Sequence, residues 1–158
     1  MPTPMPTPDD PALDEPHTTV DALVQLSFLI QGELARIAAD HDLSLIQVRL
    51  LGILRDRRPG MLELARHLDL DKSSMTGLVT RAEKRGLVRR ERSPHDGRGV
   101  LVTLTPAGTT LVNTCAQQVQ ARIAILATPL TTREGDQLRL LATKLLTAHG
   151  EGLLPSAG

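Results

Sequence analysis

The chain has 158 residues, no net formal charge, and a composition that is 41% hydrophobic and 23% charged. This length suits one domain with a buried core. Phe28 is the only aromatic side chain in the sequence, which argues against a strand-rich fold, an aromatic cage, or a platform that stacks single-stranded bases. The single cysteine, Cys115, excludes an internal disulfide and indicates a reducing compartment.

The two ends of the chain are predicted to be tails. Residues 1–17 are rich in proline and aspartate and begin with a short MPTP repeat, so we expect a disordered segment. They lack the basic start and apolar core of a secretory signal. Residues 151–158 are expected to be flexible. We find no apolar run near 18 residues and therefore expect no membrane span.

The zero net charge conceals two halves of opposite sign. Residues 43–105 hold 13 basic and 7 acidic side chains, a net charge of +6, while the rest of the chain holds 5 basic and 11 acidic, a net charge of −6. A phosphate backbone responds to the local field, so a basic lobe on an acidic body is compatible with binding DNA. An ordinary solvated surface is the alternative interpretation.

Helical spacing of apolar residues between residues 19 and 39 predicts a first helix of about five turns. Ser44 and Gln47 form a capping box for a second helix, which is expected to run to about Arg57 and to end before Pro59.

A third short helix is predicted over residues 61–68, with a turn at Asp69. Asp71 is a good N-cap for a fourth helix that ends at Gly86. Two short helices joined by a tight turn are typical of a helix-turn-helix.

Residues 87–92 and 100–105 are predicted to form two strands joined by a polar turn around Asp96-Gly97. A fifth helix is expected from Thr105-Pro106 to about Thr128. A sixth helix then follows a capping box at Thr131 and runs to about His149. The predicted fold is mainly α with a small β-hairpin wing.

The fourth helix has two contrasting faces. On a helical wheel Met75, Leu78, Val79 and Ala82 form the stripe that faces the core. The opposite face is small, hydroxyl-rich and basic, which suits a helix lying in the DNA major groove. A plain solvated face is the alternative, although such faces more often pair Glu with Lys. The residues predicted to contact DNA from this helix are Lys72, Ser73, Ser74, Thr76, Gly77, Thr80, Arg81 and Lys84.

The predicted hairpin offers a second DNA probe. Arg98 lies at the tip with little bulk around it, and a guanidinium inserted into a narrow minor groove gains from the negative potential there. Asp96 is expected to pair with a nearby arginine and so to stabilise the tip. Arg89, Arg90 and Arg92 on the first strand are expected to face phosphates. The alternative is a flexible charged turn.

These residues resemble the MarR family of bacterial winged-helix transcription regulators. The likeness runs through LELARHLDLDKSSMTGLV, RAEKRGLVRRE, the Asp96-x-Arg98 turn and LVTLTPAG, within a helix order that spans about residues 19–150. The resemblance implies a homodimer that places the fourth helix in the major groove and the wing in the minor groove of palindromic double-stranded DNA. It also implies a cytoplasmic, nucleoid-associated bacterial protein.

The predicted organisation therefore has three parts: an N-terminal dimerisation helix over residues 18–42, a winged helix-turn-helix lobe over 43–105, and C-terminal dimerisation helices over 106–150. The flanking helices carry apolar faces wider than a small lobe needs, and a two-fold pair matches paired half-sites. The side chains behind this expectation in the C-terminal part are Leu111, Val112, Val119, Ile123, Leu126, Leu130, Leu138, Leu141, Leu145 and Leu146.

Three positions depart from the common family pattern. Asp69 stands where glycine is frequent in the turn, but Asp tolerates the left-handed conformation better than most residues. Gly77 stands where a longer polar or basic side chain is frequent, which puts base contacts there in doubt. Ala82 replaces a bulkier residue.

By the same resemblance, a small organic acid binds between the dimer helices and the DNA-binding lobe and weakens DNA binding. Candidate effector-binding residues are Phe28, Arg36, Arg49 and Arg55, although core packing or surface charge also explains each. The expected function is a repressor that this effector releases from its operator.

Alternatives stay open beside this interpretation. One is a thiol-based redox regulator acting through Cys115, which we interpret instead as a buried structural residue. Another is a winged-helix module that binds protein rather than DNA. The histidines form no metal-ligand spacing, so no metal or cofactor is expected. No phosphate loop, nucleophile elbow or Cys-His arrangement indicates an enzyme.

Overall fold

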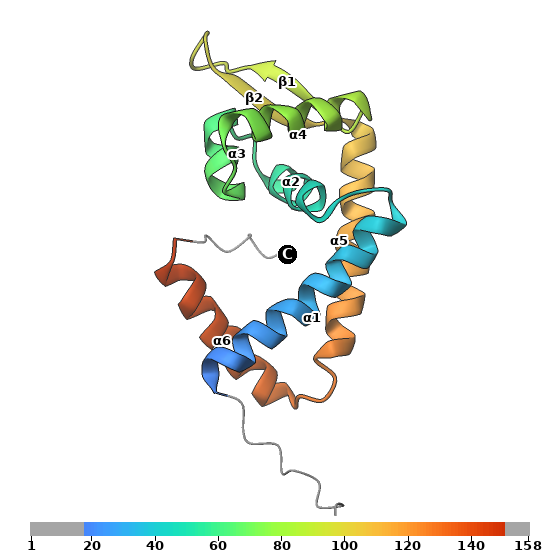
Figure 1. The fold of residues 1–158 in the computed structure, drawn as a ribbon, viewed down its shortest axis with the longest axis vertical. Coiled ribbons are helices and arrows are strands. Elements are labelled where there is room, and N and C mark those ends of the chain that lie inside the picture. Colours follow the sequence, from blue (N-terminus) through green and yellow to red (C-terminus); the bar gives the residue numbers. More distant parts are fainter. Residues whose placement is uncertain (1–17, 151–158) are drawn as a thin grey trace, which may run out of the picture.

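The computed structural model describes residues 18–150 (Figure 1). The predicted tails over residues 1–17 and 151–158 fall outside this range. The described residues form six helices and one two-stranded sheet, in the order α1 (Thr19–Asp40), α2 (Leu45–Asp56), α3 (Met61–Leu68), α4 (Lys72–Lys84), β1 (Val88–Arg92), β2 (Val100–Leu104), α5 (Pro106–Leu126) and α6 (Thr132–Ala148). This is the mainly helical fold with a hairpin that the sequence predicts.

Capping residues set the starts of the helices, as expected from the sequence. Ser44 and Gln47 form a reciprocal capping box at α2, and Thr131 and Glu134 form another at α6. The Thr105 hydroxyl accepts the N–H of Gly108 at 3.0 Å at the start of α5. Each bond satisfies a backbone donor that the first helical turn leaves free. Ends are less well predicted, because fraying and packing rather than a strong stop residue determine them.

Two residues with positive φ end the helices of the helix-turn-helix. Asp69 closes α3 at φ 53°, so the turn survives without glycine, as the sequence analysis expects. Gly86 follows α4 at φ 71°, a conformation that glycine adopts without steric cost.

The hairpin is antiparallel, with Val88 opposite Leu104 and Arg92 opposite Val100. The free edge of β2 is partly covered by the loop between α2 and α3. There the N–H of Val102 donates to the Pro59 carbonyl at 3.0 Å, and Gly60 forms a bridge to Leu101. This loop is thereby fixed against the base of the wing.

One hydrophobic core holds the lobe together. It joins α2, α3, α4 and the hairpin, and its fully buried side chains include Leu50, Leu64 and Val79. Val112 of α5 belongs to the same cluster, and Leu111 packs against it. The beginning of α5 therefore packs in the lobe, and the expectation that these two side chains serve the dimer helices is wrong.

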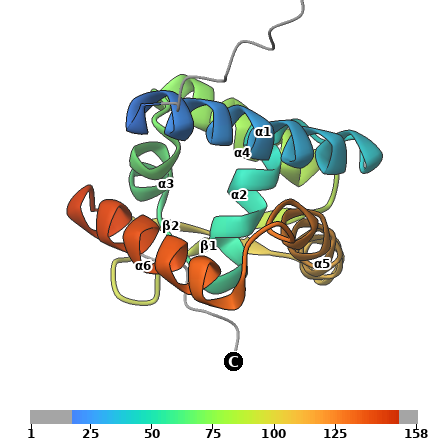
Figure 2. The same cartoon turned by 90° about the horizontal axis from the view of Figure 1, so that it is seen from below.

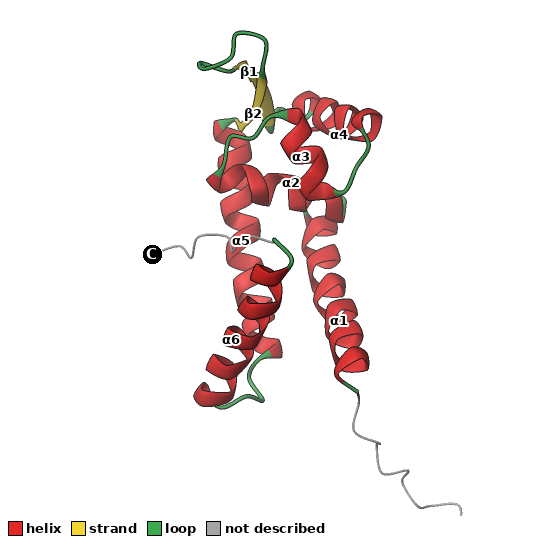
Figure 3. Cartoon of the chain, turned by 90° about the vertical axis from the view of Figure 1, so that its left-hand side faces the viewer, coloured by secondary structure: helices red, strands yellow, loops and turns green. Residues whose placement is uncertain are grey.

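The lower half of the molecule is much less packed. α6 has no buried residue, and the buried residues of α1 are Ile37 and Ala38 near its C-terminal end. α1 and α6 lie on opposite sides when the molecule is viewed from below (Figure 2), and they remain apart in the side view (Figure 3).

α1 is, by length and composition, apolar enough to cross a membrane, with a mean hydropathy of 1.2 over 18 residues, and 11% of that window is buried. The expectation that the chain holds no such run is therefore wrong. The helix also carries polar contacts to α5, where the Arg122 guanidinium lies 3.3 Å from Glu33 and 3.9 Å from Asp40. Length and apolarity of this kind equally suit a helix covered by other protein helices.

Candidate nucleic-acid interface

The position of α4 follows from its N-cap and its apolar stripe. The Asp71 carboxylate accepts the N–H of Ser74 at 2.7 Å, and this bond holds the pKa of Asp71 below its usual value. Met75, Leu78 and Val79 are at most 1% exposed, and Ala82 is 3% exposed. The predicted core stripe is confirmed, so the opposite face of α4 points outward.

That outward face carries the side chains predicted to contact DNA. Gly77 and Thr80 are half-buried, and the exposed members are Lys72, Ser73, Ser74, Thr76, Arg81 and Lys84. The Thr76 hydroxyl donates to the Lys72 carbonyl at 2.9 Å, so its hydrogen is already used within the helix. Its oxygen can still accept, while the Ser73 hydroxyl keeps its donor for an external partner. The Ser74 hydroxyl, in contrast, helps to lower the pKa of Asp71.

Gly77 has a local role that the sequence does not reveal. A Cβ at this position would lie 3.1 Å from a guanidinium nitrogen of Arg81. The missing side chain thus leaves room for the Arg81 guanidinium to fold along the surface of α4. A longer residue at position 77 would displace it.

The arginines of β1 do not form a single strip. Successive residues of a strand point to opposite faces, and Arg90 faces α4, where it forms an ion pair with Glu83 and donates to the Thr80 hydroxyl at 3.3 Å. Arg89 faces away from α4 and pairs with Glu91 at 2.6 Å. Arg92 is exposed near the end of the strand. The expectation that all three arginines face phosphates together is therefore corrected, because Arg89 and Arg90 already hold carboxylates within the chain.

The tip of the wing is held by its own backbone. The Asp96 carboxylate accepts the N–H of Arg98 at 3.1 Å, and the N–H of Gly99 donates to the Asp96 carbonyl at 3.0 Å. Asp96 therefore stabilises the turn through a backbone bond, and the expected ion pair with a nearby arginine is wrong. The Arg98 side chain is exposed at the tip.

Arg85, which is not among the residues predicted from the sequence, fixes the C-terminal end of α4. The Arg85 guanidinium donates to the carbonyls of Asp42 at 2.6 Å and His41 at 3.1 Å, in the turn between α1 and α2. Residue type alone could not distinguish Arg85 from the arginines beside it. The bonds tie the C-terminal end of α4 to the turn that follows α1.

The candidate effector residues do not come together. Phe28 is 63% exposed on α1, Arg36 is paired with Glu33 within α1, and Arg49 is exposed on α2. Arg55 lines a cavity at the end of α2, beside its ion-pair partner Asp56.

Cys115 is 4% exposed, and burial raises the pKa of its thiol. A buried thiol with a raised pKa forms little thiolate and is a poor nucleophile, so the redox alternative is not favoured. Within residues 18–150 no group of three or more His, Cys, Asp or Glu could hold a metal ion.

Comparison with known proteins finds sequence relatives of this chain. A profile of the MarR family matches residues 41–99. The HTH-type transcriptional repressor NicR of Pseudomonas putida is 32% identical over 124 residues, which cover 72% of this chain and 77% of NicR. The homoprotocatechuate degradative operon repressor of Escherichia coli is 28% identical over 127 residues, which cover 79% of this chain and 85% of that protein.

The crystal structure of wild-type MarR from E. coli in its apo form is similar to this fold, with a TM-score of 0.72 and 27% identity over 84% of this chain and 99% of that chain. The named relatives are transcriptional regulators, not enzymes. α4 with its exposed polar face, the hairpin with Arg98 at its tip, and these likenesses lead to one conclusion. The chain belongs to the MarR family of winged-helix, DNA-binding transcriptional regulators.

Proposed function

We propose that this protein acts as a homodimeric repressor of a palindromic operator and that a small organic acid releases it. One observation carries the proposal. α4 and the wing lie at one end of the molecule (Figure 3). Among the described residues, 13 of the 15 large exposed apolar side chains belong to α1, α5, α6 and the turn between the last two. A DNA-reading end and an uncovered apolar end are what a dimeric repressor requires.

For the DNA contacts, α4 enters the major groove and the Arg98 side chain enters the minor groove. Arg92 pairs with a phosphate. Arg89 and Arg90 contribute positive field, with Arg90 also supporting α4 through Glu83. The α4 residues assigned to this interface are Lys72, Ser73, Ser74, Thr76, Gly77, Thr80, Arg81 and Lys84.

For the dimer, the apolar faces of α1 and α6 cover one another across a two-fold axis. Leu23 and Leu29 on α1 are 48% and 50% exposed, and Leu141 and Leu145 on α6 are 62% and 49% exposed. Apolar patches of this kind mark protein interfaces. A two-fold pair then presents two α4 helices to half-sites about one turn of DNA apart.

The proposal that a small organic acid releases the protein from DNA is supported by the names of its relatives. One is named as the repressor of an operon that degrades homoprotocatechuate, and another is named as a repressor. We place this protein in the cytoplasm, on the nucleoid, where such a repressor would act.

The test uses the full chain and DNA from upstream of its own gene in a gel shift, titrated with salt. A specific complex is expected with two chains per site, and log K should fall linearly with log salt because arginines and lysines release counterions from phosphates. A scrambled fragment of the same length is the control. Failure to prefer the upstream fragment at low salt would contradict the proposal and would favour a module that binds protein.

A further inference from the structure

The turn between α1 and α2 is the place where the first long helix meets the lobe. Figure 1 shows α4 running from α3 at its start to α5 at its end, and the turn after α1 lies on the side where α4 ends. The buried residues of α1, Ile37 and Ala38, come just before this turn, and Ala38 belongs to the core cluster of the lobe. A bond between α4 and this turn therefore restrains how α4 is directed relative to α1.

Arg85, the C-cap of α4, makes that bond. Two nitrogens of its guanidinium donate separately to the carbonyl oxygens of Asp42, at 2.6 Å, and His41, at 3.1 Å. Carbonyls at the end of a helix lack partners within the helix and lie at the negative end of its dipole. A guanidinium is a planar fork of donors, so one side chain can bond both oxygens. No other hydrogen bond to either carbonyl occurs among the described residues.

The turn that Arg85 bonds is itself held in place. The N–H of Leu43 donates back to α1 at 2.8 Å, and Asp42 has a φ of 55°, the left-handed conformation that commonly closes a helix. His41 Nε2 lies 2.8 Å from Gln118 Oε1 on α5, so the turn is tied to α5 as well. Arg85 thus bonds a fixed point of the body formed by α1 and α5.

The same end of α4 is tied to the start of α5. The Thr105 hydroxyl donates to the Gly86 carbonyl at 2.6 Å, and the N–H of Thr105 donates to the Leu87 carbonyl at 3.0 Å. Within residues 18–150, hydrogen bonds therefore tie α4 to the long helices at its C-terminal end alone. A change of angle at that end moves the N-terminal end most, because a helix of 13 residues is about 20 Å long.

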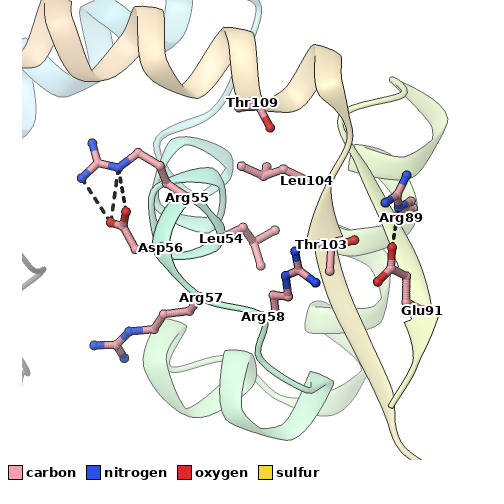
Figure 4. A pocket seen from close by; sticks show the side chains of 10 residues that line it. All are labelled: Leu54, Arg55, Asp56, Arg57, Arg58, Arg89, Glu91, Thr103, Leu104 and Thr109. Carbon is pink, nitrogen blue, oxygen red and sulfur yellow. Dashed lines mark hydrogen bonds and ion pairs between the residues drawn. The ribbon is translucent and has the colours of Figure 1, made fainter. Parts of the chain in front are cut away.

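The arginines that follow on β1 have partners of another kind. Arg89 pairs with Glu91 on the outer side of the hairpin, in the cavity that Arg58 and Thr103 also line (Figure 4). Such a pair balances charge within the lobe. Arg85, in contrast, bonds uncharged carbonyls that lie outside residues 43–105. It therefore acts on the relative position of two parts of the chain rather than on the charge balance of one.

We propose that Arg85 is a positioning residue for DNA binding. Without contacting DNA, its bonds to the turn after α1 set the direction of α4 relative to α1 and α5, and so set the separation of the two α4 helices in the dimer. Two half-sites lie at a fixed distance along the duplex, so the two α4 helices must be presented at a matching distance. This role of Arg85 rests on the proposed homodimeric function and names the residue that fixes its geometry.

The first test measures that geometry without DNA. A spin label at Ser73→Cys, near the start of α4, is placed in the full chain with Cys115→Ala, and pulsed electron paramagnetic resonance gives the distance between the two labels of the dimer. The chain that keeps Arg85 should give a narrow distance distribution, and Arg85→Ala should give a broader or shifted one. Lys84→Ala, at the exposed neighbouring position, should leave the distribution unchanged. The lost bonds are exposed, so the melting temperature of Arg85→Ala should change little.

The second test separates positioning from contact with a phosphate, using the operator and the gel shift. If the correct direction of α4 is populated only about one tenth of the time, affinity falls about tenfold, because only the competent fraction binds. The slope of log K against log salt should stay unchanged in Arg85→Ala, whereas Lys84→Ala should lower it by about one. Arg85→Lys keeps the charge but not the fork of donors, so it should recover only part of the affinity.

An operator with one base pair inserted between the half-sites adds a readout that a lost phosphate contact would not change. The wild type should bind this operator much more weakly than the natural one, because the spacing no longer matches its two α4 helices. Arg85→Ala should lose less affinity on the same insertion, since its α4 helices are less strictly positioned.

An unchanged distance distribution in Arg85→Ala would overturn the positioning role. A salt slope lowered by about one, full recovery by Arg85→Lys, or the spacing penalty of the wild type would equally overturn it. If the chain that keeps Arg85 gave no distance between labels, the proposed homodimer would be wrong, and the role of Arg85 with it. If it gave a distance but bound no operator, the repressor function alone would be contradicted, and the distances would still decide whether Arg85 positions α4.

Discussion

The lobe that carries α4 and the wing contributes thirteen of the fifteen buried side chains in the main cluster, the other two being Ala38 of α1 and Val112 of α5. In contrast, α6 buries none of its side chains and α1 buries two. Both regions are rich in leucine, so composition does not separate them. The difference lies in partners: the lobe covers its apolar faces with its own helices and hairpin, and the outer helices expose theirs. An apolar face left in water is unfavourable, by about 25 cal/mol per Å², so the outer helices leave an exposed face that the proposed second copy would cover, whereas the lobe covers its own.

The largest effect is expected from breaking the outer region. Replacing Leu141 and Leu145 together by Asp places charges in the proposed interface, which should give a monomer and lower operator affinity by about 100-fold or more, because two linked half-site contacts become one. Light scattering after size exclusion and a gel shift measure both. Thr147→Asp, on the opposite side of α6, should remain dimeric. If the double variant stayed dimeric, the apolar face of α6 would not be the dimer interface, and the proposed difference between the two regions would be wrong.

The second largest effect is expected at the junction of the two regions, where the start of α5 packs against the end of the lobe at Leu87. A Cβ at Gly108 would lie 1.9 Å from the carbonyl oxygen of Leu87, so Gly108→Ala must push α5 away from the hairpin. We expect a loss of about 3 kcal/mol in the free energy of unfolding, measured by urea denaturation.

The matched control is Gly52→Ala in α2, where no atom lies within 4 Å of the added Cβ. Higher helix propensity should stabilise that variant by up to about 1 kcal/mol. Similar unfolding curves for the two variants would show that α5 does not pack on the lobe in this way.

Within the lobe, a substitution at the tip of the wing is expected to change the affinity for DNA without changing the stability of the fold. Arg98→Ala should reduce operator affinity by about tenfold, because a specific contact to DNA contributes about 1–3 kcal/mol. The melting temperature should not change, since the Asp96 bond uses the backbone of Arg98. Fluorescence anisotropy on labelled operator measures the first quantity. His95→Ala, in the same exposed turn, is the control, and an unchanged affinity for Arg98→Ala would contradict the minor-groove assignment.

A finer comparison sets two arginines of β1 against each other. Arg92→Ala should lower the slope of log K against log salt by about one, as one phosphate contact is lost, without affecting stability. Arg90→Ala should lower stability by up to about 1 kcal/mol through loss of its half-buried pair with Glu83. Salt titrations and thermal unfolding of both variants check this. If both variants lowered the slope of log K against log salt equally, Arg90 would also contact a phosphate, which would contradict the distinction between the two arginines.

The smallest expected effect is a loss of folding stability at acidic pH. The pKa of Asp71 is lowered in the folded state by the bond from the Ser74 N–H, so the stabilisation from the ionised cap is complete above the usual pKa of 3.8 and is lost as pH falls through the lower, folded value. Asn caps a helix but does not titrate. The stability of the wild type relative to Asp71→Asn should stay constant from pH 7 to 5 and decline below about 4; a constant difference at all pH values would contradict the charged cap.

Much of the lobe could be predicted from the sequence because its signals are local. The capping box at Ser44, the Asp71 cap, the core stripe around Val79 and the tight turn of the hairpin each depend on residues a few positions apart. The left-handed turn at Asp69 is predictable for the same reason. Errors arise where residue type does not reveal which of several possible partners a side chain takes. The Asp96 carboxylate bonds the backbone N–H of Arg98 instead of an arginine side chain, and Arg90 of β1 pairs with Glu83 of α4.

The sequence by itself determined the order of the elements, the basic lobe and the buried and outward faces of α4, because periodicity, capping and charge act along a few turns of chain. Only the tertiary structure decided which arginines are already paired, why Gly108 tolerates no side chain, and that Arg58 and the unbonded hydroxyl of Thr103 face one cavity. Gly108 and Leu87, and Arg58 and Thr103, are brought together from tens of positions apart, and Arg90 and Glu83 belong to two different elements. No local pattern carries that information, since the distances between such groups are set by how the helices pack on the hairpin.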